Sequence, residues 1–262
     1  MPPTDASPDT EDTLDLGLPG ELAALLAAQA AETTETAETA KATEAVEAVE
    51  AAEAGAPRYA VPRGLPVLPP APEALLDQVG EWSPAPTPLG AFRLVPVRLP
   101  DDLPLVARWM NDPAVAEFWE LAGPERRTEE HLRTRLDGDG RSVPCLGVLD
   151  GTPMSYWEIY RADLDPLARH CPARPHDTGV HLLIGEAADR GRGVGACLLR
   201  AVADLVFAHR PACARVLAEP DVRNVPSVAA FLGAGFRFAA EVELPGKRAA
   251  LMIRDRSLRH LL

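Results

Sequence analysis

The chain has 262 residues, a formal charge of −13 and a sequence pI of about 4.9. Residues 1–88 hold 16 acidic and 3 basic residues, so the whole net charge lies there, which speaks against non-specific nucleic-acid binding by this segment. No stretch approaches the ~20 apolar residues of a membrane span, and the first residues lack the basic and apolar regions of a secretory signal.

The first third of the chain divides by composition. Residues 1–56 are rich in Ala, Glu and Thr, whose side chains are too small to build a core, so we expect a disordered acidic tail. Residues 57–88 contain nine prolines and are typical of an extended linker. A solvated spacer is the simpler interpretation, and a segment that binds a partner protein is the alternative.

Residues 89–262 should form one mixed α/β domain with a good core. Periodicity and cap signals predict its elements, with Asp150-Gly151 and Pro245-Gly246 as hairpin turns. The expected strands are 92–97, 142–149, 154–161, 180–185, 215–219, 236–244 and 249–254. The expected helices are 103–110, a short one after Pro113, one that Thr128 caps, 194–209 and 225–233, and residues 163–177 should be an irregular loop.

The four cysteines form no Cys-x-x-Cys pair, and no His cluster accompanies them at zinc-ligand spacing. Free thiols and no structural metal are therefore expected, in keeping with a cytoplasmic protein.

A glycine-rich turn, Arg190-Gly191-Arg192-Gly193-Val194-Gly195, stands between the expected strand 180–185 and the expected helix 194–209. Glycines let backbone N–H groups approach an anion, and a helix start adds unpaired donors and a positive dipole end. The order of strand, glycine turn and helix therefore predicts a site for a phosphate-bearing ligand.

Two spaced motifs carry a resemblance to a known superfamily. Arg190, Gly193 and Gly195 fit an [Arg/Gln]-x-x-Gly-x-[Gly/Ala] loop, and Asn224-x-x-Ser227-x-x-x-Phe231-x-x-x-Gly235-Phe236 fits the later helix and strand. The chain resembles the GNAT superfamily of acyl-CoA-dependent N-acyltransferases. The resemblance implies an α/β (α+β) fold whose mixed central sheet, flanked by helices, is splayed between its fourth and fifth strands. It also implies acyl-CoA, most simply acetyl-CoA, as co-substrate.

A closer resemblance covers residues 92–256. It is similar to the siderophore-biosynthesis branch, whose members acylate the side-chain hydroxylamine or amine of lysine, ornithine or cadaverine. The segments that carry it are Trp109-Met110-Asn111-Asp112-Pro113, Phe118-Trp119, Tyr156-Trp157-Glu158-Ile159-Tyr160, His181-Leu182-Leu183-Ile184-Gly185, Glu219-Pro220-Asp221-x-Arg223-Asn224 and Leu244-Pro245-x-Lys247.

The resemblance implies a set of co-substrate contacts. The backbone of Arg190, Gly191, Arg192, Gly193, Val194 and Gly195 would bind the coenzyme A pyrophosphate. A main-chain N–H near Leu183 would face the thioester oxygen as a small oxyanion site. Asn224 and Ser227 would contact pantetheine, with a helix N-cap as the alternative for Asn224.

For proton transfer, His181 and Asp221 are the candidates, because the two strand ends that carry them should converge at the splay. The alternatives are a half-buried strand histidine and a turn or cap carboxylate. Many GNAT enzymes have a proton-donating tyrosine where this chain has Phe231, so that role must pass to another group or to water.

Acceptor contacts are predicted for Trp109, Asn111, Trp119, Trp157, Glu158 and Lys247. An aromatic wall with a few polar groups suits a methylene chain with a polar head. Packing in the core is the alternative for the tryptophans, and a solvated turn is the alternative for Lys247.

The leading hypothesis is therefore an N-acyltransferase that acts on a small amine or hydroxylamine. The alternatives are an aminoglycoside N-acetyltransferase, a protein N-terminal acetyltransferase and a non-catalytic acyl-CoA-binding module.

Overall fold

The computed structural model of the chain describes residues 76 and 78–261, all within one compact unit, Leu68–Leu262. Its strands are β1 (Ala85–Thr87), β2 (Gly90–Pro96), β3 (Ser142–Leu149), β4 (Thr152–Arg161), β5 (Thr178–Ile184), β6 (Arg215–Ala218), β7 (Arg237–Leu244) and β8 (Lys247–Asp255). Its α-helices are α2 (Leu103–Met110), α3 (Pro113–Trp119), α4 (Glu125–Leu136), α5 (Val194–His209) and α6 (Val225–Gly233). None of these helices is long and apolar enough to cross a membrane.

The eight strands form one mixed sheet in the order β1-β2-β3-β4-β5-β6-β8-β7. Every neighbouring pair is antiparallel except β5 and β6, which are parallel. That parallel pairing involves only Thr178 with Val216 and Gly179 with Leu217. Beyond Gly179 the two strands diverge, and this divergence is the predicted splay. It lies between the fifth and sixth strands, not the fourth and fifth, because the short strand β1 was not among the predicted strands.

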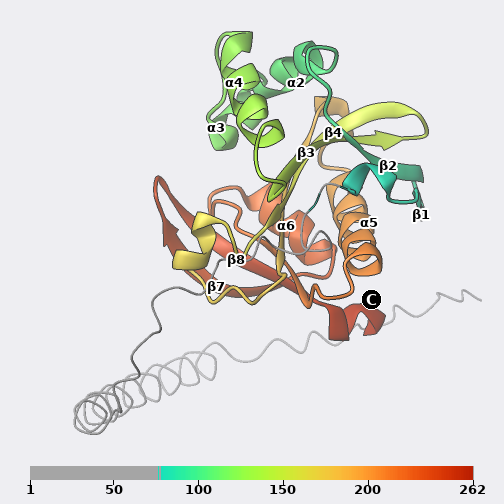
Figure 1. Ribbon diagram of the computed structural model, residues 1–262, viewed down its shortest axis with the longest axis vertical. Helices are drawn as coiled ribbons and strands as arrows, with labels where there is room; N and C mark the ends of the chain where they lie inside the picture. Colours follow the sequence, from blue (N-terminus) through green and yellow to red (C-terminus); the bar gives the residue numbers. More distant parts are fainter. Residues whose placement is uncertain (1–75, 77, 262) are drawn as a thin grey trace, which may run out of the picture. The chain divides into compact units, whose positions relative to one another are not determined.

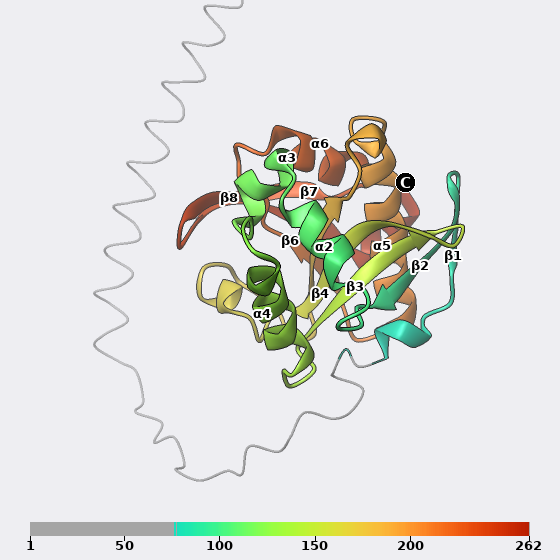
Figure 2. The ribbon, with the colours of Figure 1, turned by 90° about the horizontal axis from the view of Figure 1, so that it is seen from above.

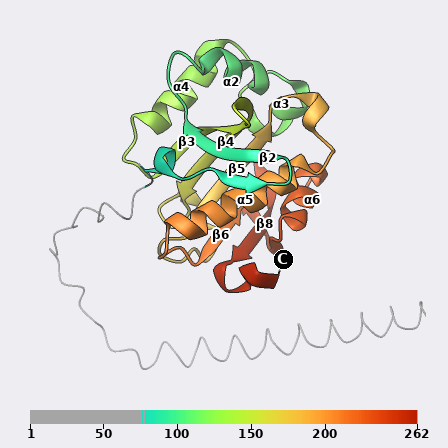
Figure 3. The same ribbon diagram turned by 90° about the vertical axis from the view of Figure 1, so that its right-hand side faces the viewer.

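Helices cover both faces of the sheet, as the side view in Figure 3 and the front view in Figure 1 show. On one side, α2, α3 and α4 enclose an apolar cluster that includes Trp109, Leu132 and Tyr156. On the other, α5 and α6 pack over a larger cluster that contains Trp157 and Phe231. Seen from above in Figure 2, the β7–β8 hairpin extends away from the β1–β2 end of the sheet.

Local sequence signals explain several boundaries. The Asp150-Gly151 turn between β3 and β4 has positive φ at both residues (46° and 86°), the requirement of a tight hairpin of this kind. The Asp112 side chain accepts a hydrogen bond from the Ala114 N–H (3.0 Å) and so caps α3, whose first residue is Pro113.

Apart from shifts of one or two residues at the ends of strands, two local features differ from those predicted. Thr128 does not cap a helix: α4 begins at Glu125, and Thr128 is fully buried within it. The expected loop after β4 includes a short 3₁₀ turn, Pro166–Arg169.

The fold also begins earlier than residue 89. Leu76, Val79 and Trp82 are buried in the core, and the Trp82 ring stacks on His209 at the end of α5, with centroids 5.3 Å apart. The last part of the expected linker is therefore part of the core, because Trp82 stacks on the end of α5 and Leu76 and Val79 are buried in the same cluster.

Candidate functional site

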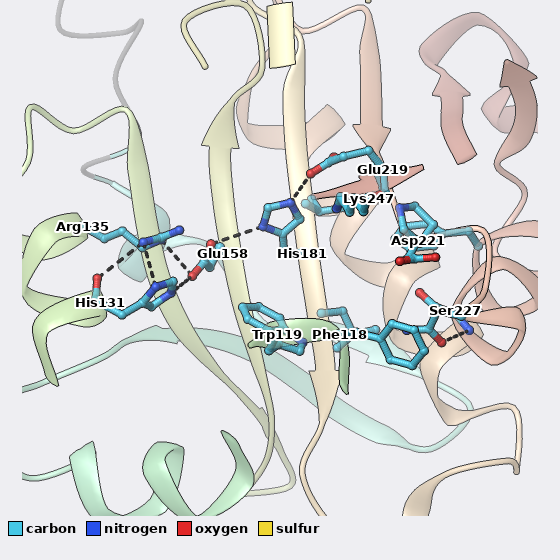
Figure 4. A pocket seen from close by; sticks show the side chains of 16 residues that line it. Phe118, Trp119, His131, Arg135, Glu158, His181, Glu219, Asp221, Ser227 and Lys247 are labelled. Carbon is cyan, nitrogen blue, oxygen red and sulfur yellow. Dashed lines mark hydrogen bonds and ion pairs between the residues drawn. The ribbon is translucent and has the colours of Figure 1, made fainter. Parts of the chain in front are cut away.

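A cavity of about 230 Å³ lies where β5 and β6 diverge. Strand β5 contributes Val180, His181 and Leu182, and the segment that begins at the end of β6 contributes Ala218, Glu219, Pro220 and Asp221. Helix α6 supplies one end, and residues of α3 and α4 supply the other. The remaining lining residues are Phe118, Trp119, His131, Arg135, Glu158, Asn224, Ser227, Phe231 and Lys247. Figure 4 shows the side chains at close range.

The ladder between β4 and β5 decides which backbone groups face this cavity. The Gly185 N–H donates to the Met154 carbonyl (2.9 Å), so Leu183 and Tyr156 are a hydrogen-bonded pair in the antiparallel ladder. The Leu183 N–H therefore points to β4 and not to the cleft. By alternation, Leu182 and Ile184, on either side of Leu183, present their backbone groups to the diverging edge.

The glycine-rich turn forms an exposed loop at the start of α5. Gly191 and Gly193 have φ values of 71° and 78°, which other residues rarely adopt, and a Cβ at either would meet nothing within 4 Å. Gly193 occupies the N-cap of α5 without a side-chain cap, so the first N–H groups of the helix are not closed off by a side chain. Arg192 is exposed, and Val194 and Gly195 lie half-buried in the first turn.

The Arg190 side chain is occupied within the protein. Its Nε donates to the Ile184 carbonyl (2.9 Å), its Nη2 to the Gly185 carbonyl (2.6 Å) and its Nη1 to Asp112 Oδ1 (2.9 Å). This guanidinium therefore fixes the loop to the end of β5 and to the start of α3.

His181 lies between two buried carboxylates. Its Nδ1 is 3.2 Å from Glu158 Oε2, and its Nε2 hydrogen-bonds to Glu219 Oε1. Both contacts are visible in Figure 4. Glu158 faces His181 across the β4–β5 ladder, whereas Glu219 follows β6 and reaches across the splay. About a third of the His181 side chain is exposed, while Glu158 is 2% and Glu219 is 7% exposed.

This arrangement holds His181 in its charged form at neutral pH. Burial opposes the charge, but Glu219 and Glu158 outweigh it and raise the pKa of His181 to about 10. Burial likewise opposes ionisation of Glu219, yet His181, Lys247 and Tyr160 lower its pKa to about 2. An imidazolium is a proton donor and a positive charge, not a base.

Glu158 is the centre of a hydrogen-bond network in the wall of the cavity. Its Oε1 accepts from His131 Nε2 (2.6 Å), Arg135 Nε (2.8 Å) and the Tyr156 hydroxyl (2.9 Å). Burial would raise its pKa, but His131, His181 and Arg135 hold the pKa well below the usual range. Arg135 Nη1 lies 3.2 Å from His131 Nδ1, and because a guanidinium can only donate, Nδ1 is the acceptor of that contact and Nε2 faces Glu158.

Tyr160 completes the support of Glu219. Its hydroxyl donates to Glu219 Oε2 at 2.6 Å. The ring crosses Gly179, where an added Cβ would lie 2.0 Å from the Tyr160 ring, so only glycine fits there. Burial raises the pKa of Tyr160 well above its usual value and keeps the phenol protonated.

Asp221 lines the same cavity, but its carboxylate is bound to Arg223. The Arg223 Nη2 and backbone N–H donate to it at 2.7 and 2.8 Å, and the Arg223 contact lowers its pKa. The direct partners of His181 are therefore Glu158 and Glu219, not Asp221.

The predicted acceptor residues divide into two groups. Trp119, Glu158 and Lys247 line the cavity, and Lys247 Nζ donates to the Glu219 carbonyl at 2.7 Å. The other three lie elsewhere. Trp109 is packed in the core and donates to Glu186 (3.2 Å), Asn111 ties α2 to Gly123, and Trp157 lies on the opposite face of the sheet against Phe92.

The α6 residues lie at the other end of the cavity. Asn224 caps α6 by accepting from the Ser227 N–H (3.1 Å), and both residues line the cavity. Phe231 lines it as well and packs edge-to-face on Phe236, with centroids 5.1 Å apart.

Comparison with known proteins agrees with this geometry. Residues 98–244 match the acetyltransferase (GNAT) domain family. The chain belongs to this family and is an acyltransferase. It is 35% identical to the lysine N-acyltransferase MbtK of Mycobacterium sp. (strain MCS), over 71% of this chain and 77% of that protein. It is 34% identical to the N(6)-hydroxylysine O-acetyltransferase of Escherichia coli, over 63% of this chain and 53% of that protein.

Solved structures show the same fold. An uncharacterized protein from Bacillus halodurans superposes with a TM-score of 0.62 at 34% identity, covering 65% of this chain and 87% of that one. The aminoglycoside acetyltransferase AAC(6')-Ib in complex with coenzyme A gives a TM-score of 0.55 at 23% identity, covering 65% and 96%.

Four functional groups of this GNAT site were not among the predicted site residues: His131, Arg135, Tyr160 and Glu219. Tyr160 had a usable signal, because it shares a face with Glu158 by the two-residue period of a strand. By the same alternation, the side chains of the adjacent residues Trp157 and Glu158 point to opposite faces of the strand. His131 and Arg135, four residues apart, share a face of α4. Only the tertiary fold brings this face into contact with Glu158 on β4.

Proposed function

We propose that this chain transfers an acyl group from acyl-CoA to the side-chain amine or hydroxylamine of a small lysine-type acceptor, as in siderophore assembly. The observation that carries the proposal is the juxtaposition at one cavity of the diverging β5 edge and a buried acid–histidine cluster. The names of the relatives agree with it, since they refer to lysine and N(6)-hydroxylysine acylation.

The co-substrate side is supported by the exposed glycine loop and by the start of α5. Gly191 and Gly193 leave room for a pyrophosphate to approach backbone N–H groups, Gly195 lies in the first turn of the helix, and the helix dipole favours the charge of the pyrophosphate. We assign the pantetheine arm to the cleft between Leu182 on β5 and Asn224 and Ser227 on α6. Acetyl-CoA is the simplest donor for a cavity of this size.

The acceptor side is supported by Trp119 and Phe118, which offer an apolar wall beside charged groups. A polycationic aminoglycoside would need a cleft with an excess of carboxylates. Here the carboxylates already have cationic partners, so the site suits a smaller amine better.

Transfer forms a C–N bond and breaks a C–S bond: the nitrogen gives one proton to water, the sulfur takes one from its donor, and the donor regains a proton from water. We assign the proton donor to the His181 imidazolium, which Glu158 and Glu219 hold beside the cleft. This assignment fills the role that Phe231 cannot perform. Asp221 stays in the proposal as a cavity carboxylate that Arg223 neutralises.

The test is thiol release from acetyl-CoA and succinyl-CoA. The acceptors are side-chain N-hydroxylated lysine, ornithine and cadaverine, their parent amines and one aminoglycoside. The proposal expects release with at least one lysine-type acceptor and a fall of roughly 10²- to 10⁴-fold in kcat for His181→Asn. Release only with the aminoglycoside would move the function to that class, and tight coenzyme A binding without any release would indicate a non-catalytic module.

A further inference from the structure

The cavity has two chemically different ends. Figure 4 shows Arg135 and His131 from α4 at one end and Ser227 of α6 at the other, with His181 between them. The α6 end adjoins the diverging strands and is assigned to the pantetheine arm. An acceptor whose nitrogen reaches His181 must therefore lie toward Arg135 and along Trp119.

The carboxylates that line this cavity are all paired with cations. Glu158 is paired with Arg135 and His181, Glu219 with His181, and Asp221 with Arg223. The Lys247 ammonium binds a backbone carbonyl. Among the lining residues, three cations (Arg135, His181 and Lys247) thus face three carboxylates, and each carboxylate already has a cationic partner, so a ligand ammonium group finds no unpaired carboxylate here.

Arg135 is the cation best placed at the acceptor end. Its side chain is 28% exposed, which leaves it accessible from the cavity yet partly shielded from water. Its Nε is committed to Glu158 and its Nη1 to His131, while its Nη2 has no partner among the residues that the structure describes. Two contacts fix the guanidinium plane in advance, which lowers the entropic cost of binding a carboxylate.

We propose that Arg135 binds the α-carboxylate of the acceptor, so that this chain acylates an amino acid with a side-chain amine or hydroxylamine and discriminates against diamines. The inference rests on the proposed function. Arg135 and His181 contact opposite oxygens of one carboxylate, Glu158, and a short methylene chain along Trp119 spans that separation. Guanidinium–carboxylate pairing supplies the geometry and the charge-assisted hydrogen bonds.

The test compares N6-hydroxylysine with N-hydroxycadaverine, which lacks only the carboxylate. The wild-type chain should prefer N6-hydroxylysine. Arg135→Gln should lower kcat/KM for that acceptor by roughly 10- to 100-fold more than it lowers kcat/KM for N-hydroxycadaverine, because both acceptors depend on the contact of Arg135 with Glu158 but only N6-hydroxylysine brings a carboxylate. Arg133→Gln, an exposed arginine on the same helix, should change neither. Arg135→Lys should retain only part of the wild-type kcat/KM for N6-hydroxylysine, because an ammonium lacks the planar fork with which a guanidinium binds Glu158 and the acceptor carboxylate together.

Four results would overturn the inference. An equal loss of kcat/KM on both acceptors in Arg135→Gln would mean that Arg135 only supports Glu158. Loss of the preference for N6-hydroxylysine in Lys247→Met, and not in Arg135→Gln, would mean that Lys247 binds the carboxylate. Wild-type preference for N-hydroxycadaverine would reject the carboxylate contact while leaving the proposed function standing. The absence of turnover with every amine and hydroxylamine would reject both.

Discussion

Arg190 in the glycine-rich loop donates through Nη1 to Asp112, the N-cap of α3, at 2.9 Å. The same carboxylate oxygen accepts from the Ala114 N–H. Because α3 carries Phe118 and Trp119 into the cavity, this ion pair joins the expected pyrophosphate loop to the expected acceptor wall. Order in the loop is thus tied to the position of Trp119.

We expect this link to couple the two substrates. Coenzyme A should raise acceptor affinity in the wild-type chain, on the order of fivefold, and Asp112→Asn should remove most of that gain. Asparagine preserves the N-cap and removes only the charge paired with Arg190. Calorimetry of acceptor binding with and without coenzyme A measures the effect, and Glu117→Gln, exposed on the same helix, is the control. Unchanged coupling in Asp112→Asn would reject the link.

The Glu158–His181–Glu219 arrangement predicts a titration outside the usual histidine range. His181 should show no protonation change between pH 5 and 8 by NMR, since its pKa is about 10. Glu219→Gln removes the leading favourable charge and should move the titration toward neutral pH. A wild-type His181 resonance that titrates near pH 6.5 would contradict the proposed protonation state.

The same shifts predict how stability depends on pH. The raised pKa of His181 stabilises the fold fully below pH 6.5, and this contribution is lost as the pH rises through about 10. The lowered pKa of Glu219 contributes fully above pH 4.5, and that contribution is lost as the pH falls through about 2. Urea unfolding of wild-type and Glu219→Gln proteins should therefore differ most between pH 4.5 and 6.5 and converge toward pH 10.

Phe231 allows a test of the proton donor. If His181 supplies the proton, Phe231→Tyr alone should change kcat little, because a second donor adds nothing to a step that already has one. In the His181→Asn background, the same tyrosine should recover part of the lost rate. A large gain from Phe231→Tyr in the wild-type background would argue that the leaving thiolate lacks a donor. Presteady-state thiol release separates these outcomes from slow product release.

Local signals predicted the elements well. The 103–110, 194–209 and 225–233 helices and the 142–149 strand have the bounds that periodicity and caps indicated. These features depend on neighbours in sequence, such as Asp112 before Pro113 or the Asp150-Gly151 turn. The splay was predicted through resemblance, because divergence of β5 from β6 depends on how two strands 30 or more residues apart are packed.

The side-chain partners of the site were harder to predict. Glu219 and Asp221 both follow β6, and nothing local says that the first reaches His181 while the second turns to Arg223. Trp109 and Trp157 are aromatic residues in segments that were expected to contact the acceptor, but their side chains are buried in the core. Strand alternation excludes Trp157 from the cavity once Glu158 is known to line it. The burial of Trp109, in contrast, follows only from the packing of α2 on Gly185.

The early start of the fold predicts the outcome of truncation. A chain of residues 68–262 retains Leu76, Val79 and Trp82, whereas a chain of residues 89–262 loses all three and also β1, which pairs with β2. Loss of a buried tryptophan costs about 3–5 kcal/mol, equivalent to a fall in Tm on the order of 10 °C in a domain of this size.

Thermal unfolding of the two truncated chains measures this difference. Trp82→Ala in the full chain is the matched variant, because it removes the stack on His209 without shortening the chain. We expect the 89–262 chain to melt well below the 68–262 chain, with Trp82→Ala between the 89–262 chain and the full chain. Equal melting temperatures for the two truncated chains would place the start of the domain at residue 89, as composition alone indicated, and would deny Trp82 its part in the core.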